Sequence, residues 1–398
     1  MLAVAVLVMG ASLSNSLPSD FTIADGQDLI INSDIPISAN RQSVSNGSSP
    51  SKSKRSTFSV NLFGIIPVTD VSAKYEQNKQ VLLCGQPFGI KIYTEGVMVV
   101  GITDVKTENE TVNAAKNAGI KKGDIILKAN DKKLTSNEDL RQIIEQSEGS
   151  SITLLCKREE TTFNAVISPV FCTEQNCYKA GIWVRDSSAG IGTLTFIDPD
   201  SGAFGGLGHS VCDVDTGKTL PILSGQALSA EIIGIKKGQK GAAGEIQGCF
   251  ISNKSLGEIN LNDQCGVFGR YEGSTDSLER AQVAMRQDVK KGKAEIMSAV
   301  SGKVEKYSCS IERISLKDDK QQNLTVRITD KRLLELTGGI VQGMSGSPII
   351  QDGRLVGAVT YVFVDDPTLG YGIFAESMLE KAEQSANDFG QNTASKAS

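Results

Sequence analysis

The second half of the chain consists of short β-prone runs separated by glycine, and this pattern limits the possible folds most strongly. From about residue 171 onward, runs such as GIWVRD, GIGTLTFID, AEIIGIKKG and GVFGRY follow one another without a long amphipathic helix. Only the segment ESMLEKAEQSA, near the C-terminus, has the pattern of a helix. Runs of this kind, with turns every eight to twelve residues or so, are typical of an all-β barrel or sandwich.

Composition narrows the classes of function. The chain has 398 residues, which suggests two or three domains. Its net charge is −5, so the composition gives no electrostatic support for binding nucleic acid. It contains no run of about eighteen apolar residues, which excludes a polytopic membrane protein. Because His209 is the only histidine, sites that bind a metal through several histidines are excluded, and we expect neither a metal nor another cofactor.

The N-terminal 57 residues give no indication of a folded domain. Residues 1–17 begin with an apolar run that, as a helix of about twelve residues at ~1.5 Å each, would reach only ~18 Å of a ~30 Å bilayer core. We predict a signal or anchor segment, although no Lys or Arg precedes it, with a buried N-terminal strand as the alternative. Residues 18–57 are poor in large apolar side chains and predict a disordered linker that a protease can reach. The basic cluster at residues 52–55 is most simply a solvated charge run.

After an extended lead-in over residues 58–80, residues 81–169 resemble a PDZ domain. The segment AGIKKGDIILKAND and a helix that Ser136 could cap carry this resemblance. In PDZ domains a glycine-containing loop binds a peptide carboxylate through backbone N–H groups, and the peptide adds a strand to the sheet. The resemblance implies an α+β domain whose carboxylate-binding loop consists of Gln86, Pro87, Phe88, Gly89 and Ile90.

The segment GMSGSP, residues 343–348, has the residues that a serine nucleophile needs. A serine hydroxyl attacks a carbonyl only when a base takes its proton and preplaced donors stabilise the oxyanion. Gly343 allows a backbone turn in which the N–H groups of Gly343 and Ser345 form that oxyanion hole, and Gly346 leaves room for substrate. An Asp-Gly hairpin follows at once. The segment resembles the nucleophile loop of chymotrypsin-like proteases, which implies a double β-barrel over residues 170–385, followed by a flexible tail, 386–398. A glycine-rich turn with an ordinary surface serine is the alternative.

The base in this mechanism must be His209, because no other histidine is present. It precedes Ser345 in the chain, which is the order found in chymotrypsin-like proteases. The carboxylate that orients the imidazole is not fixed by spacing, and the candidates are Asp213, Asp215, Asp263 and Asp330.

Three longer segments resemble the family of SpoIVB-type serine peptidases. They are GHSVCDVDTG, the run from ITDKRLLELTGGIVQGMSGSP through its hairpin, and YGIFAESML. Together with the PDZ-like unit and the LFGIIPV lead-in, the similarity covers about four-fifths of the chain. It implies a catalytic triad of His209, Asp330 and Ser345.

The resemblance also implies a signalling role. Proteins of this family are made in the forespore of endospore-forming bacteria and cross its inner membrane into the space facing the mother cell. They cleave themselves near the N-terminus, and then a regulator of an intramembrane metalloprotease, so that a pro-sigma factor is processed. Here the N-terminus would tether the chain to the membrane or be released, and the PDZ domain would recognise the N-terminal segment or a partner peptide.

Two alternatives to a signalling protease remain open. One is a non-catalytic scaffold in which the PDZ domain binds a peptide and the protease domain is inactive. The other is a housekeeping protease of the trypsin-plus-PDZ kind, which the PDZ-first order disfavours. The eight scattered cysteines predict neither a disulfide pairing nor a zinc site.

Overall fold

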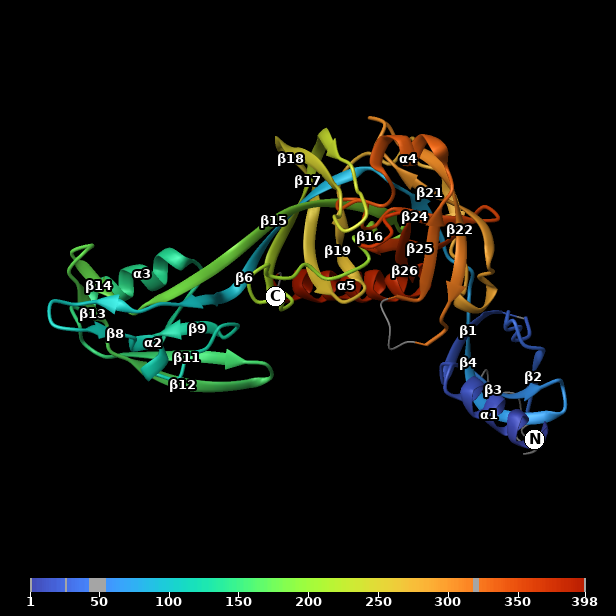
Figure 1. Ribbon diagram of the computed structural model, residues 1–398, viewed down its shortest axis with the longest axis horizontal. Helices are drawn as coiled ribbons and strands as arrows, with labels where there is room; N and C mark the ends of the chain where they lie inside the picture. The colour runs from blue at the N-terminus through green and yellow to red at the C-terminus, as the bar shows by residue number, and fades with distance from the viewer. Residues whose placement is uncertain (1, 26, 43–54, 318–321, 397–398) are drawn as a thin grey trace.

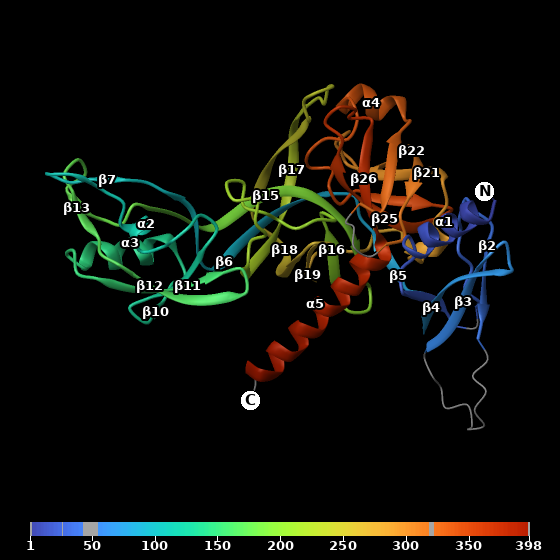
Figure 2. The same ribbon diagram turned by 60° about the horizontal axis from the view of Figure 1, so that its bottom comes forward.

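The structure is a computed structural model that describes residues 2–25, 27–42, 55–317 and 322–396. The chain forms an N-terminal unit and a PDZ-like unit at opposite ends of the molecule, with two β-barrels between them (Figures 1 and 2). This mostly β architecture confirms the predicted fold class.

The N-terminal unit is a small four-stranded sheet with its own core. Phe21, Ile23 and Leu29 are buried against Phe58 and Val60. The prediction of a disordered linker over 18–57 is therefore wrong for its described residues, while residues 43–54, with most of the basic cluster, lie outside them. The sheet has the order β1-β4-β3-β2, and the elements are α1 (Leu2–Ser14), β1 (Asp20–Ala24), β2 (Ile37–Arg41), β3 (Arg55–Leu62) and β4 (Ile66–Glu76).

The first barrel closes through a ring of paired strands in the order β6-β17-β18-β19-β16-β15 and back to β6. Phe88, Ile92, Phe204 and Val267 fill its interior. The strands are β6 (Pro87–Ile102), β15 (Ile182–Ile197), β16 (Ala203–Gly206), β17 (Ile222–Lys236), β18 (Glu245–Asp263) and β19 (Gly266–Tyr271), with β5 (Gln80–Leu83) and β20 (Arg280–Gln282) extending the sheet beside β15.

The PDZ-like unit is an insertion in this barrel. Strands β6 and β15 pair from Pro87↔Thr193 to Ile102↔Ile182, and this long ribbon leads out of the barrel into the unit (Figure 1). The expectation that a PDZ domain over 81–169 precedes the protease is corrected, because β5 and half of β6 belong to the barrel. The inserted elements are β7 (Val105–Lys106), β8 (Thr111–Val112), α2 (Ala114–Asn117), β9 (Ile125–Ala129), β10 (Lys132–Lys133), α3 (Asn137–Gln146), β11 (Ile152–Arg158), β12 (Thr161–Ile167), β13 (Val170–Cys172) and β14 (Cys177–Lys179).

The PDZ-like unit has a separate core in which Val97, Val99, Leu140 and Leu154 are buried. Ser136 caps α3 as expected, since its hydroxyl accepts a hydrogen bond from the N–H of Asp139.

The second barrel is closed in the order β21-β22-β23-β26-β25-β24. The expected Asp-Gly turn joins β24 to β25, with both Asp352 and Gly353 at positive φ. The elements are the 3₁₀ helix η1 (Arg286–Asp288), β21 (Gly292–Ser298), β22 (Glu305–Ile314), β23 (Leu324–Ile328), α4 (Lys331–Thr337), β24 (Pro348–Gln351), β25 (Arg354–Val362), β26 (Leu369–Phe374) and α5 (Ala375–Lys396).

Helix α5 joins the two barrels. Met378, Leu379 and Ala382 pack in a core shared by Phe196 of the first barrel and Ile350 of the second. The helix continues through Lys396, so the predicted flexible tail is helical over its described residues. None of the described helices combines the length and apolar character needed to cross a membrane. All eight cysteines are free thiols.

Candidate active site

The loop between α4 and β24 carries Ser345, and two glycines determine its shape. Gly343 has φ +96°, and a Cβ there would lie 2.9 Å from the Cβ of Ile246. Gly346 has φ +94°, and a Cβ there would lie 2.0 Å from the carbonyl oxygen of Thr193. Gly346 therefore allows close packing against the first barrel, whereas the sequence had suggested that it leaves room for substrate.

Within residues 342–347, two amides donate no hydrogen bond to any residue that the structure describes, and they are those of Gly343 and Ser345. Their neighbours are all engaged: the N–H of Gln342 donates to Gly244, that of Met344 to Val341 and that of Gly346 to Val359. Unpaired backbone donors at the serine itself and two residues before it are what an oxyanion hole requires.

His209 and Ser345 contact two consecutive residues of β25, Tyr361 and Thr360. The Ser345 hydroxyl donates to the carbonyl oxygen of Thr360 at 2.7 Å. The His209 ring stacks on Tyr361, with ring centroids 4.8 Å apart. No hydrogen bond joins the imidazole to the hydroxyl among the described residues, because the Ser345 hydroxyl is engaged by Thr360.

The imidazole has a defined orientation without a carboxylate. His209 Nδ1 lies 2.9 Å from the carbonyl oxygen of Ser210. Because a carbonyl can only accept, a neutral ring holds its proton on Nδ1 and leaves Nε2 free as a base. Burial lowers the pKa of His209 below its ordinary value of 6.5, although the Ser210 carbonyl partly opposes this shift. The ring is therefore neutral at pH 7, as a general base must be.

No hydrogen bond joins Asp330 to His209 in the part of the chain that the structure describes, so the catalytic role that the family resemblance implies for Asp330 stays a prediction. Asp330 is the N-cap of α4, and its carboxylate accepts hydrogen bonds from the N–H groups of Ser308, Arg332 and Leu333. Partial burial alone would raise the pKa of Asp330, but hydrogen bonds from Arg332 and Ser308 hold it below its ordinary value.

The other three candidate carboxylates are also engaged elsewhere. Asp213 and Asp215 both pair with Arg185, and Asp263 pairs with Lys381. Asp213 is fully buried, and it also accepts hydrogen bonds from its own turn. None of these carboxylates bonds to the imidazole in the described part of the chain.

The predicted PDZ loop is wrong. Pro87–Ile90 are not a loop but the first residues of β6, with β15 paired on one side and, from Phe88, β17 on the other. Phe88 and Ile90 are buried in the first barrel. Their backbone groups already belong to a sheet, so residues 86–90 cannot receive a peptide carboxylate.

A different edge of the PDZ-like unit is open. Residues 182–185 of β15 pair with β6 on one side, and no described strand pairs with their other side. Ile182 and Val184 pack on the PDZ core together with Ile143 of α3. Sequence reasoning missed this edge because β15 follows the PDZ-like segment and reads as the start of the protease.

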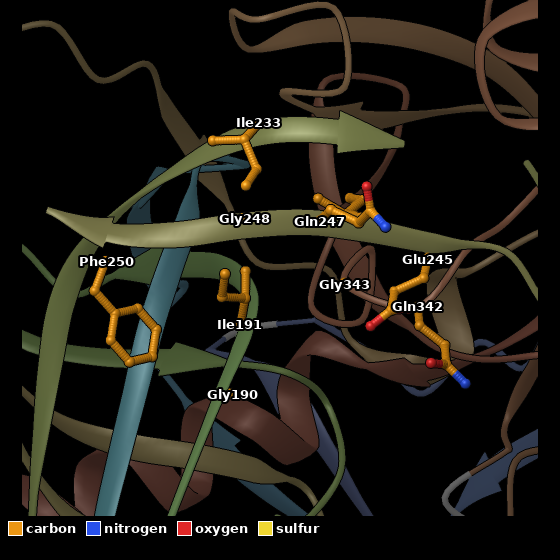
Figure 3. Close-up of a pocket in the computed structure, with 10 residues that line it drawn as sticks. Gly190, Ile191, Ile233, Glu245, Gln247, Gly248, Phe250, Gln342 and Gly343 are labelled. Carbon is orange, nitrogen blue, oxygen red and sulfur yellow. The ribbon is translucent and has the colours of Figure 1, made fainter. Parts of the chain in front are cut away.

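A cavity of about 780 Å³ lies between the nucleophile loop and the first barrel (Figure 3). One wall is apolar and another carries the side chains of Glu245 and Gln342. Because Gly343 lines this cavity, a group bound there lies next to that residue, whose amide is unpaired. The lining residues are Gly190, Ile191, Ile233, Glu245, Ile246, Gln247, Gly248, Phe250, Gln342 and Gly343.

Comparison with known proteins agrees with this architecture. A model of the SpoIVB peptidase S55 family matches residues 176–379, just over half of the chain, and a PDZ domain model matches residues 113–158. Among solved structures, the PDZ domain of an SdrC-like protein from Listeria monocytogenes is 21% identical over 23% of this chain and 87% of that chain, with a TM-score of 0.19. No curated protein matches. The resemblance seen in the sequence is confirmed, and the chain belongs to the SpoIVB peptidase S55 family of serine peptidases, with a PDZ domain inserted in its first barrel.

Proposed function

We propose that the protein is a serine endopeptidase in which Ser345 is the nucleophile and His209 the base. The observation that carries this proposal is the pair of unengaged amides at Gly343 and Ser345, on either side of Met344. Both residues are partly exposed, so their amides can reach a substrate carbonyl, as oxyanion stabilisation needs.

The chemistry needs only these groups. Nε2 of His209 takes the proton of Ser345 as Oγ bonds to the substrate carbonyl carbon, and the oxyanion accepts hydrogen bonds from the two amides. The C–N bond then breaks while His209 returns the proton to the leaving amine, and water releases the acyl group by the same steps. The Ser210 carbonyl holds the imidazole in the required tautomer, as a carboxylate does in the Ser-His-Asp triad.

The substrates that family membership favours are proteins in a sporulation signal. We propose that the chain crosses the forespore inner membrane and cleaves its own N-terminal region. It then cleaves a membrane-associated regulator of an intramembrane metalloprotease, so that a pro-sigma factor is processed. The apolar α1 at the N-terminus supports a membrane-directed or membrane-tethered start, and the 780 Å³ cavity beside Gly343 offers a site for a substrate side chain.

The PDZ domain would bind its peptide at the open edge of β15. A peptide that adds as a strand there would pair with residues 182–185 and pack beside α3.

Mass spectrometry of purified protein tests the proposal. We expect wild type to trim itself and to react with a fluorophosphonate at Ser345, and Ser345→Ala and His209→Ala to do neither. Ser347→Ala is the matched control, because this buried hydroxyl lies two residues away and has no hydrogen-bond partner. A wild type that neither trims itself nor reacts would favour the non-catalytic scaffold.

A further inference from the structure

Thr193, on β15, links the loops of both catalytic residues. Its N–H donates to the carbonyl oxygen of Ser345 at 2.9 Å, and its hydroxyl donates to the carbonyl oxygen of Gly343 at 2.8 Å. Its own carbonyl oxygen accepts from the N–H of Leu207, two residues before His209, at 3.2 Å. All three polar groups of Thr193 therefore bond to catalytic loops.

The two carbonyls that Thr193 binds belong to the same residues whose amides are unpaired. Fixing the Gly343 carbonyl limits rotation of the adjoining peptide planes. This restraint is needed because glycine adopts positive and negative φ about equally readily, so Gly343 does not hold its positive φ by itself. The Thr193 side chain is buried, with 3% of the residue exposed, so no water replaces its hydroxyl.

We propose that Thr193 is a positioning residue that holds the oxyanion-binding amides of Gly343 and Ser345 in place. It touches neither the substrate nor the reacting atoms, and it acts through the loop. This inference rests on the proposed peptidase function and extends the working site to a residue of the first barrel.

The neighbouring Thr195 shows why the side-chain bond at 193 is separate from general packing. Its hydroxyl also binds the loop, but at the carbonyl of Gly346, beyond the nucleophile. Among the side chains that the structure describes, only the Thr193 hydroxyl binds Gly343, the residue that contributes the first proposed oxyanion donor.

The test compares Thr193→Val, which removes the hydroxyl but keeps the side-chain shape, with Thr193→Ser, which keeps the donor. Reaction of Ser345 with a fluorophosphonate is followed at several concentrations to separate the limiting rate from the half-saturating concentration. We expect Thr193→Val to lower the limiting rate roughly a hundredfold, with little change in the half-saturating concentration. Thr193→Ser, which keeps the donor, should have a limiting rate within about threefold of wild type. If Thr193 only stabilised the fold, Thr193→Val would not lower the limiting rate while leaving the half-saturating concentration unchanged, and Thr193→Ser would not keep a near wild-type limiting rate.

Thr94→Val is the matched control, because Thr94 is equally buried and its hydroxyl also donates to backbone carbonyls, those of Gly96 and Asp186. We expect it to react at the wild-type rate. If Thr193→Val does not fold, as judged by its thermal transition, Thr193→Ala replaces it with the same expected loss.

Two results would overturn the inference. If wild type and Thr193→Val react equally fast, Thr193 does not position the amides, and the peptidase proposal stands. If wild type does not react at Ser345 at all, both proposals fail together.

Discussion

At the scale of single residues, the site depends on backbone groups as much as on side chains. The His209 imidazole is oriented by a carbonyl, the Ser345 hydroxyl donates to a carbonyl, and the proposed oxyanion donors are amides. Sequence identified His209 and Ser345 because their residue types are distinctive. It could not choose the orienting group, because any residue supplies a carbonyl and no sequence pattern marks which one faces the ring.

The lowered pKa of His209 predicts the acid limb of the activity. Because the neutral ring is the proposed base, the midpoint of the decline of kcat/KM with falling pH should lie below pH 6.5. Burial against Tyr361 contributes to this shift, so Tyr361→Ala should move the limb upward and Tyr361→Phe should leave it in place. Measuring kcat/KM as a function of pH gives the midpoint of this decline. A wild-type midpoint at or above pH 6.5 would contradict the expectation.

The same pKa also affects stability. The unfolded chain has the higher pKa and binds a proton first, so acidification below pH 6.5 favours unfolding. His209 therefore contributes a loss in the free energy of unfolding between pH 6.5 and its folded pKa, and Tyr361→Ala should reduce that loss.

At the scale of elements, variants of Asp330 distinguish the triad role that the family resemblance implies from the helix-capping role that the structure shows. As the N-cap of α4 it should be replaceable by Ser, whereas Asp330→Ala should cost about 1 kcal/mol of stability. Both variants, once folded, should keep a kcat near that of wild type. Thermal denaturation and kcat measure the two effects. A folded Asp330→Ser that loses roughly ten-thousandfold in kcat would instead place Asp330 on the imidazole.

The sequence predicted correctly those features that depend on a few neighbouring residues, namely a helix cap and a hairpin turn. The Ser136 cap and the Asp352-Gly353 turn both formed where the sequence placed them. The start of β6 was misread as a loop because Pro87 and Gly89 are residue types typical of turns. Its continuity depends on β15, whose partner residues lie about a hundred positions later. The N-terminal sheet was missed because residues 18–57 contain few large apolar side chains. Its core forms only when β1 pairs with β4, about fifty positions later in the chain.

At the scale of the whole molecule, the insertion of the PDZ domain predicts which fragments fold. A fragment of residues 176–398 includes the whole S55 match but lacks β5 and β6. The first barrel would then be open between β15 and β17, without Phe88, Ile90 and Ile92 in its core. We expect no cooperative thermal transition by circular dichroism.

The matched variant removes the PDZ domain without opening the barrel. Tyr93 and Ser187 are paired across the β6–β15 ribbon, so an Asn-Gly turn can replace residues 94–186. This variant should unfold cooperatively and still react at Ser345. A stable 176–398 fragment, or an unfolded Asn-Gly variant, would show that the ribbon does not organise the barrel as described.

The insertion also dictates an order of events during synthesis. β6 leaves the ribosome before the PDZ domain, while its barrel partners β17, β18 and β19 emerge only after it. The PDZ domain is therefore translated in full while the barrel half of β6 still lacks its partner β17. Ser345, the proposed nucleophile, is translated later still, so the proposed peptidase activity can begin only after the PDZ domain has been translated.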